Sequence, residues 1–239
     1  MKRSQVNALI RDAIAFFEAH RFYLPPFALW TPADWATKGP EIQEVLDHEL
    51  GWDVTDYGRG SFDTLGLLLF TLRNGSAADL KLGKGKLYAE KVMISRSGQV
   101  SPMHFHWAKT EDIIHRGGGR LILELYQADE DGALSQEDVS FNMDGVARRA
   151  PAGHRVSLTP GESITLTPGL YHAFWAEDGA VLVGEVSTVN DDHRDNRFHD
   201  PMGRFPAIEE DEPPLHLLVG DYAAYVHPRP KGRASERCT

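Results

Sequence analysis

Three residues near the middle of the chain have the side chains and the spacing of a metal site. His104 and His106 lie two positions apart in a segment with the pattern of a β-strand, so both imidazoles project from the same face. Glu111 follows five positions after His106, and Gly98 and Gly118 flank the whole group. We therefore expect the two imidazoles and the carboxylate to bind one ion together.

A fourth ligand is expected from a second motif, about 60 residues further along the chain. Here the dipeptide Pro168-Gly169 predicts a turn that enters a strand, and this strand would point His172 inward. Three imidazole nitrogens and one carboxylate suit manganese, iron, cobalt, nickel or zinc better than calcium or magnesium. We expect one divalent transition metal per chain, with water or substrate in the remaining coordination positions.

The elements that must position these ligands are short β-strands. After Asp56, β-prone runs alternate with glycine-rich turns, and no strong helix interrupts them before Val189. Strands at this spacing without intervening helices predict an antiparallel sandwich or barrel rather than a parallel α/β sheet. The expected strands are 67–72, 87–95, 120–127, 154–158, 163–166 and 181–189.

A helical segment precedes the strands, and a loop-rich segment follows them. Apolar residues recur at spacings of three and four from Ser4 to His20, which predicts an amphipathic helix with Ser4 as its N-cap. Shorter helices are expected to begin at the prolines of 32–35 and 40–46. The acidic run 209–212 is expected on a solvated face, and the tail from His227 is expected to be mobile.

These segments predict a single domain with three parts. The parts are a helical appendage over residues 1–56, a β-barrel over 57–190 and a loop-rich C-terminal extension over 191–239.

The composition excludes several classes of protein. The chain has 239 residues with an ordinary globular composition, and its net charge of -10 argues against nucleic acid or anionic membranes as partners. The longest apolar run, 65–72, is far shorter than the roughly 20 residues of a membrane-spanning helix, and the N-terminus lacks the pattern of a secretory signal. With one cysteine, Cys238, there is no internal disulfide, so we expect a cytoplasmic protein. We also expect a homodimer, the commonest symmetric oligomer.

The two histidine motifs resemble those of the cupin superfamily. The first cupin motif, a glycine followed by His-x-His, glutamate and glycine, is matched in full by Gly98, His104, His106, Glu111 and Gly118. The second motif, Pro-x-Gly leading to a histidine, is present as Pro168-Gly169 followed by His172, and Ala176 stands where asparagine is frequent. The resemblance implies an all-β fold: an antiparallel, double-stranded jelly roll, the cupin β-barrel, with the N-terminal helices as an appendage.

Longer stretches resemble one family of cupins in particular. The sequences HFHWAKTEDIIHRGGG, TPGLYHAFWAE and GEVSTVNDDHRDNRF, together with the N-terminal helices, are similar to the D-lyxose isomerase family. This resemblance implies a metal-dependent isomerase that interconverts D-lyxose and D-xylulose, and also D-mannose and D-fructose, at one manganese ion. The layout is also similar to that of cupin phosphomannose isomerases, in which a lysine lies two residues before the ligand glutamate. Lys109 holds that place here.

Four further residues are candidates for the chemistry of such a reaction. Aldose-ketose isomerisation moves a proton between C1 and C2 through an enediolate, so it requires an electrophile on the oxygens and a positioned acid/base pair. Lys109 lies between two ligands, where a bound metal would lower its proton affinity, so it is a candidate to donate to the developing alkoxide or to stabilise it. Glu185, which interrupts an apolar run, is our candidate base. Asp191, Asp192 and Arg194 follow its strand, where they could bind sugar hydroxyls, and we keep Asp191 and Arg194 as the candidates.

Three other functions fit the same residues. The ligand set also suits Fe(II), so a cupin dioxygenase stays open. A non-catalytic sugar-binding cupin stays open as well, although no basic recognition helix of a DNA-binding sensor is visible. A phosphosugar isomerase of the mannose 6-phosphate type would need a phosphate site, for which Lys81, Lys84 and Lys86 are candidates, but the net charge of -10 disfavours a dianionic substrate.

Overall fold

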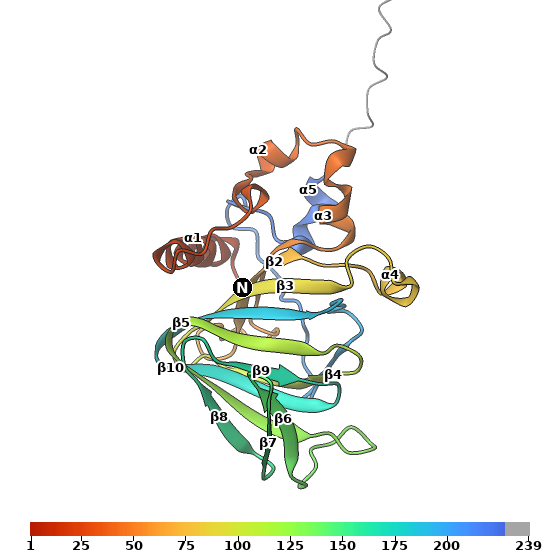
Figure 1. Cartoon of the computed structure of the whole chain (residues 1–239). Coiled ribbons are helices and arrows are strands. Elements are labelled where there is room, and N and C mark those ends of the chain that lie inside the picture. Colours follow the sequence, from red (N-terminus) through yellow and green to blue (C-terminus); the bar gives the residue numbers. More distant parts are fainter. Residues whose placement is uncertain (228–239) are drawn as a thin grey trace, which may run out of the picture.

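The structure, a computed structural model, describes residues 1–227, and most of them belong to one antiparallel β-sheet or to the helices that cover it (Figure 1). The sheet has the strand order β1-β2-β3-β10-β5-β9-β6-β7, with β4 paired to β10, β11 to β4, and β8 to β5. The predicted antiparallel all-β fold with N-terminal helices is confirmed. The strands are β1 Gly51–Thr55, β2 Leu67–Arg73, β3 Tyr88–Ser95, β4 Ser101–His106, β5 Glu111–Gln127, β6 Val139–Met143, β7 Val146–Ala150, β8 His154–Leu158, β9 Ser163–Leu166, β10 Leu170–Thr188 and β11 Asn196–Phe198.

The long strands β5 and β10 run beside each other and join the two halves of the sheet. For β5 only the second half was expected, and for β10 a strand at His172 and a separate strand over 181–189 were expected, because the glycines between the halves are typical of turns. The strands bend there instead of ending, and their pairing register shifts between Glu177 and Val181. Gly118, with φ +104°, permits the close approach at this bend, since a β-carbon would lie 2.1 Å from the carbonyl oxygen of Ala180. The pair therefore forms a continuous scaffold across the molecule.

Two apolar cores lie on the two faces of the sheet. Along β2 the side chains alternate, so that Leu67 and Leu69 enter the inner core while Leu68 and Phe70 enter the outer one. The inner core also contains the apolar residues of β5, β8 and β9. The outer core is covered by α1, whose buried apolar residues are Val6, Ile10, Ala13 and Phe17.

Some short elements differ from the expectations. The helix α4 (Ala77–Leu82) interrupts the strands; its six residues are too few to produce a clear apolar periodicity. β1 lies within the segment 1–56 that was expected to be mostly helical, and all five of its residues are buried. The hairpin of β6 and β7 was missed because most of its residues are exposed, so apolar alternation is weak.

The N-terminal helices follow the expected order, but their caps differ. The first helix is α1 (Arg3–Ala19), and its N-cap is Lys2 rather than Ser4. The Ser4 hydroxyl instead donates to the Asp211 carboxylate at 2.7 Å. The run 209–212 is exposed as expected, and it also holds the start of α1 in place. The remaining helices are α2 Pro32–Trp35, α3 Gln43–Asp47 and α5 Tyr222–Tyr225, with 3-10 turns at Pro26–Leu29, Pro40–Ile42 and Val219–Asp221.

Nothing in residues 1–227 forms a helix long and apolar enough to cross a membrane. The tail that was expected to be mobile lies outside the described residues apart from His227, and so does Cys238.

A buried arginine fastens the first helix to the C-terminal segment. Arg3 is fully buried, and its Nη1 and Nη2 donate to the two carboxylate oxygens of Asp221 at 2.9 and 2.8 Å. Its Nε and Nη2 also donate to Glu210 at 2.8 and 2.6 Å. The hydrogen bond to Glu210, together with the charge of Asp221, raises the pKa of Arg3 despite its burial. The guanidinium therefore stays charged and links two ends of the described chain.

The substitution Arg3→Met is expected to lower the free energy of unfolding by about 3–5 kcal/mol, because it leaves Asp221 buried without its cation. Urea denaturation of the purified protein measures the difference. Arg11 is exposed on the same helix, so Arg11→Met is the control and should change stability by less than about 0.5 kcal/mol. Equal losses in both variants would contradict the role given to Arg3.

The same contact gives a pH dependence. The hydrogen bond from Arg3 lowers the pKa of Glu210, so this carboxylate adds stability above its unfolded pKa of about 4.3 and loses that contribution as the pH falls through the lower folded value. Glu210→Gln should therefore be less stable than the wild type at pH 7, and the difference should shrink near pH 3. Glu209→Gln, at a more exposed neighbour, is the control. A difference that is constant with pH would count against this linkage.

Candidate metal centre and catalytic cavity

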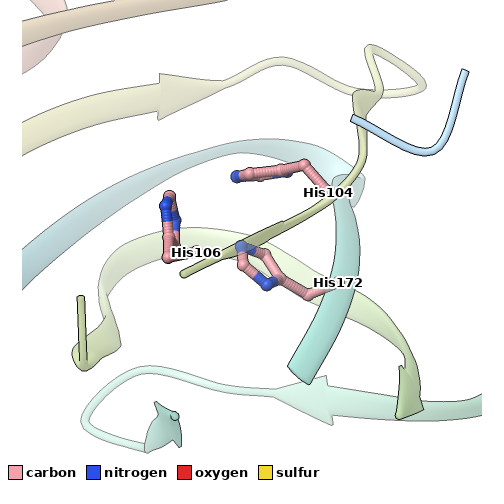
Figure 2. A group of neighbouring side chains, drawn as sticks. All are labelled: His104, His106 and His172. Atoms are coloured by element: carbon pink, nitrogen blue, oxygen red, sulfur yellow. The ribbon is translucent and has the colours of Figure 1, made fainter. Parts of the chain in front are cut away.

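Three histidines converge on one point inside the sheet (Figure 2). His104 and His106 belong to β4 and His172 belongs to β10, and the register pairs His172 directly with His104. One ring nitrogen from each of the three lies within 4.8 Å of the others. The expectation that these imidazoles share one site is therefore supported by their geometry.

Hydrogen bonds select which nitrogen two of these rings offer. Nδ1 of His104 lies 2.8 Å from the carbonyl oxygen of Pro102, and Nδ1 of His172 lies 3.1 Å from that of Leu170. Because a carbonyl only accepts, both Nδ1 atoms carry the proton and both Nε2 atoms keep a free lone pair. Both ring nitrogens of His106 are buried without a hydrogen-bond partner among the described residues. A buried unpaired nitrogen is costly unless a ligand satisfies it, which fits a metal at this point.

The surroundings keep the imidazoles of His104 and His106 neutral. Burial lowers the pKa of His104 well below its usual value, and the neighbouring histidines lower it further. Burial also lowers the pKa of His106, and the charge of Lys109 acts in the same direction. Neutral imidazole is the form that binds a metal, so these ligands are ready at neutral pH.

Glu111 brings a carboxylate to the histidines. It is the first residue of β5, and its Oε1 lies 3.3 Å from Nε2 of His106 and 3.2 Å from Nε2 of His172. Its Oε2 lies 2.6 Å from Nζ of Lys109. Burial by itself would raise the pKa of Glu111, but Lys109 and His106 outweigh it and hold the pKa well below the usual value. The carboxylate is therefore charged and joins the group expected from the sequence.

The turn before His172 is tied to the strand of the other histidines. Leu170 N donates to the Thr167 carbonyl at 3.1 Å, and Gly169 has φ +76°, the geometry of a turn with proline and glycine at its centre. Gly169 N also donates to the carbonyl oxygen of His106 at 3.0 Å. The expected Pro-Gly turn therefore fixes β10 against β4 at the site.

Lys109 and Glu185 meet beside the metal ligands. Both side chains are buried, and Nζ of Lys109 donates to Oε1 of Glu185 at 3.0 Å. Burial lowers the pKa of Lys109, but the carboxylates of Glu111 and Glu185 outweigh this effect and raise it. From the sequence, we expected a bound metal to lower the pKa of Lys109. The surrounding side chains alone have the opposite effect and raise this pKa. The backbone N–H of Lys109 is fixed by Asp195 Oδ2 at 3.0 Å.

Sequence reasoning missed two residues of this cluster, Lys91 and Asn190. Nζ of Lys91 lies 3.4 Å from Oε1 of Glu185 and donates to Oδ1 of Asn190 at 2.7 Å. The same Oδ1 accepts from Lys109 at 3.2 Å. Lys91 lies on β3 next to the buried residues 92–95, and a lysine beside the apolar run Val92-Met93-Ile94 is the signal that was available.

The two candidate sugar ligands lie outside the cavity, while a neighbour lines it. Asp191 Oδ1 accepts from the backbone of His193, and Arg194 is exposed. Neither lines the cavity that holds the metal ligands, whereas Asp192 does. Burial would raise the pKa of Asp192, but Lys91 and other cations outweigh it and lower the pKa strongly.

Arg204, in the C-terminal extension, completes the far side of the cavity. Its Nη2 lies 2.5 Å from Oδ2 of Asp53 and 3.4 Å from Oδ2 of Asp192. Burial lowers its pKa, but these carboxylates raise it by more. This residue is 93 positions beyond Glu111 in the sequence, so no local pattern connects it with the site.

The cavity is polar on one side and apolar on the other. Its volume is about 40 Å³, so little space is left between the side chains that line it. The apolar side includes Tyr57, Met93, Phe174 and Phe198, and Phe198 also contacts the His104 ring. A larger cavity of about 610 Å³ lies between α1 and residues 56–64, and its lining contains none of the candidate metal ligands and neither Lys109 nor Glu185.

Comparisons with known proteins agree in their result. A family model described as D-lyxose isomerase matches residues 1–222. A D-lyxose/D-mannose isomerase of Serratia proteamaculans is 52% identical over 229 residues, which are 95% of this chain and 100% of the relative. A D-lyxose/D-mannose isomerase of Escherichia coli O157:H7 is 50% identical over 228 residues, which are 94% of this chain and 100% of the relative.

The fold is similar to that of solved L-ribose isomerases. The structure of the Acinetobacter sp. DL28 L-ribose isomerase in complex with L-ribose superimposes with a TM-score of 0.58 and 16% identity, covering 87% of this chain and 98% of that one. The Cellulomonas parahominis enzyme with L-psicose gives a TM-score of 0.56 and 21% identity, with the same coverage. At these identities the likeness concerns the fold alone.

The purified protein is expected to bind about one transition metal ion per chain, and His172→Ala or Glu111→Gln should remove most of it because each deletes a ligand. Elemental analysis after gel filtration measures the metal content. His154 is exposed on β8, so His154→Ala is the control and should keep the wild-type content. Full metal content in His172→Ala would rule out this site.

Proposed function

The chain belongs to the D-lyxose isomerase family, and from that premise we propose that it interconverts D-lyxose and D-xylulose, and D-mannose and D-fructose. One observation carries the proposal: a buried lysine and a buried glutamate, the groups needed for acid/base chemistry, lie in the same cavity as four metal-ligand side chains. The reaction is proposed to proceed by proton transfer through a cis-enediolate.

The residues proposed to hold the metal are His104, His106, Glu111 and His172. Three imidazoles, of which burial keeps His104 and His106 neutral, and one charged carboxylate match a divalent transition metal, and we propose manganese, the metal implied by the family resemblance. When bound, such an ion polarises the sugar oxygens at C1 and C2 and so makes the proton on the neighbouring carbon more acidic.

Glu185 is proposed to move the proton between C1 and C2. Both lysine contacts to this carboxylate are made to Oε1, so Oε2 is left to exchange a proton with the substrate. The burial of Glu185 excludes water from the carboxylate and helps the same proton to return to the adjacent carbon. One carboxylate then serves both steps, as base towards the aldose and as acid towards the enediolate.

Lys109 is proposed to stabilise the negative charge that develops on a sugar oxygen. Its raised pKa keeps the ammonium charged in the arrangement described, which favours electrostatic stabilisation over proton donation. Glu111 and Glu185 hold the ammonium between the metal ligands and the proposed base. A cation fixed at this position is worth more than one in solvent because water is excluded.

The other functions have less support from the geometry. Lys81, Lys84 and Lys86, the phosphate candidates, lie at or near α4, and none of them lines the catalytic cavity. A dioxygenase remains testable, since it would consume oxygen without forming a ketose. The expected homodimer also remains a prediction, which analytical ultracentrifugation checks.

The metal-loaded protein is expected to convert D-lyxose to D-xylulose and D-mannose to D-fructose, and both activities should disappear on chelation and return with added manganese. Chromatographic detection of the ketose with parallel measurement of dissolved oxygen separates this function from the dioxygenase. Oxygen consumption in the absence of any ketose product would overturn the proposed function.

Glu185→Gln is expected to lower kcat by roughly a hundredfold or more while changing KM little, because the base acts mainly in the transition state. Glu90→Gln, on the neighbouring strand β3 and outside the cavity, is the matched control with near wild-type kinetics. Reaction in D2O should place solvent deuterium at C1 or C2 of the sugar in only a fraction of turnovers, because the buried carboxylate returns much of the original proton. Wild-type turnover in Glu185→Gln would remove this residue from the mechanism.

A further inference from the structure

Arg204 is buried in the cavity wall with one hydrogen-bonding group unused. Its Nη2 contacts Asp53 and Asp192, while its Nη1 is buried and has no hydrogen-bond partner among the described residues. A buried N–H without an acceptor costs free energy, and a substrate or a water that enters the cavity can supply that acceptor. A neutral hydroxyl oxygen is a suitable acceptor.

The position of Arg204 assigns it to one end of the cavity. A chain of contacts runs from Glu111 through Lys109 and Glu185 to Lys91, and from Lys91 to Asp192 at 3.8 Å. Arg204 follows Asp192 at the end of this chain, and its ion pairs are with Asp53 and Asp192 rather than with a candidate metal ligand. A sugar whose C1 and C2 oxygens lie at the metal would therefore extend the rest of its chain towards Arg204.

The charges around Arg204 suit a hydroxyl and oppose an anion. Two carboxylates, Asp53 and Asp192, compensate its single positive charge, and both are buried or nearly so. Asp53 comes from β1 and Thr55 of the same strand donates to the Arg204 carbonyl at 2.7 Å, so the side chain and its backbone are both held. Because these carboxylates already compensate the charge of the guanidinium, Arg204 does not provide a net positive charge that would attract a phosphate.

We propose that Arg204 is a specificity-determining residue, whose Nη1 donates to a hydroxyl in the half of the sugar remote from C1 and C2, and whose pairing with Asp53 and Asp192 excludes phosphate esters from that end. The inference rests on the proposed isomerase function and adds to it a residue that recognises a hydroxyl group of the substrate. It predicts free aldoses, and not their phosphates, as the substrate class.

The test compares D-lyxose with its 4-deoxy and 5-deoxy analogues on wild type, Arg204→Lys and Arg204→Met. The wild type should discriminate against at least one analogue by about tenfold or more in kcat/KM, whereas both variants should accept that analogue within about twofold of D-lyxose, because the hydrogen bond is already lost. Arg204→Lys keeps the charge that pairs with Asp53 but lacks the second nitrogen, so it separates hydroxyl recognition from folding. The exposed Arg197 in β11 offers the control Arg197→Lys, which should discriminate like the wild type.

Calorimetric binding of the same sugars repeats the comparison without turnover. A wild type that binds but does not isomerise D-lyxose would overturn the proposed function and leave the binding comparison to decide the inference. If Arg204→Lys discriminates between D-lyxose and the analogue as strongly as the wild type, in kinetics or in binding, the inference about Arg204 is overturned. The proposed isomerase function is not affected by that result. Failure of the wild type to discriminate against either analogue would overturn the inference as well.

The phosphate prediction has its own variant. Asp53→Asn removes one compensating charge while keeping an oxygen for Nη2, so the ratio of kcat/KM for D-mannose 6-phosphate to that for D-mannose should rise by about tenfold or more. Asp138→Asn removes a carboxylate from an exposed arginine pair with Arg149, and it should leave the ratio unchanged. An unchanged ratio in Asp53→Asn would overturn the exclusion of phosphate by charge pairing.

Discussion

The negative charge of a carboxylate buried inside a β-sheet must be compensated by a nearby cation. The pairing of Glu111 with Lys109 meets this requirement, and the rest of the site depends on it. The two side chains are 3% exposed each and 2.6 Å apart. An unpaired charge at that depth would be costly, so each residue requires the other. The pairing then extends through further side chains of alternating sign, namely Glu185, Lys91, Asp192, Arg204 and Asp53. Loss of one member leaves its neighbour with an uncompensated charge.

The sheet satisfies this constraint because the charges come from strands that are neighbours. β10 pairs with β3, β4 and β5, and it carries both His172 and Glu185. β3 contributes Lys91, β4 the two remaining histidines and β5 Glu111. Strand pairing therefore fixes the spacing of the charged groups before any side-chain contact is formed. The bend at Gly118 matters for the same reason, since it lets β5 and β10 stay paired on both sides of the register shift.

The part of the site that could be predicted is the part with short-range sequence spacing. His104, His106 and Glu111 lie in one motif, and the Pro-Gly turn marks His172, so their types and intervals were sufficient. The antiparallel fold followed from strands without intervening helices, although long strands with internal glycines looked like two. Asp191 was expected to bind the sugar, but Asp192 is the residue that lines the cavity. In a strand successive side chains point to opposite faces, whereas in a loop they follow no such rule, so the sequence does not show which of two neighbours points inward. Lys91, Asn190 and Arg204 are joined to the site by tertiary contacts only.

The residues that line the cavity come from different parts of the sequence, and these parts can change independently in evolution. Asp192, Asn196, Phe198 and Arg204 all come from one contiguous stretch, whereas the metal ligands, Lys109 and Glu185 lie on or beside the strands β4, β5 and β10. Within this stretch β11 (Asn196–Phe198) pairs with the histidine strand β4, whereas Asp192 and Arg204 lie outside the strands on either side of β11. Substitutions at Asp192 and Arg204 can therefore alter one part of the cavity wall without changing the pairing of the strands that carry the candidate metal ligands, so the two parts of the site can diverge separately.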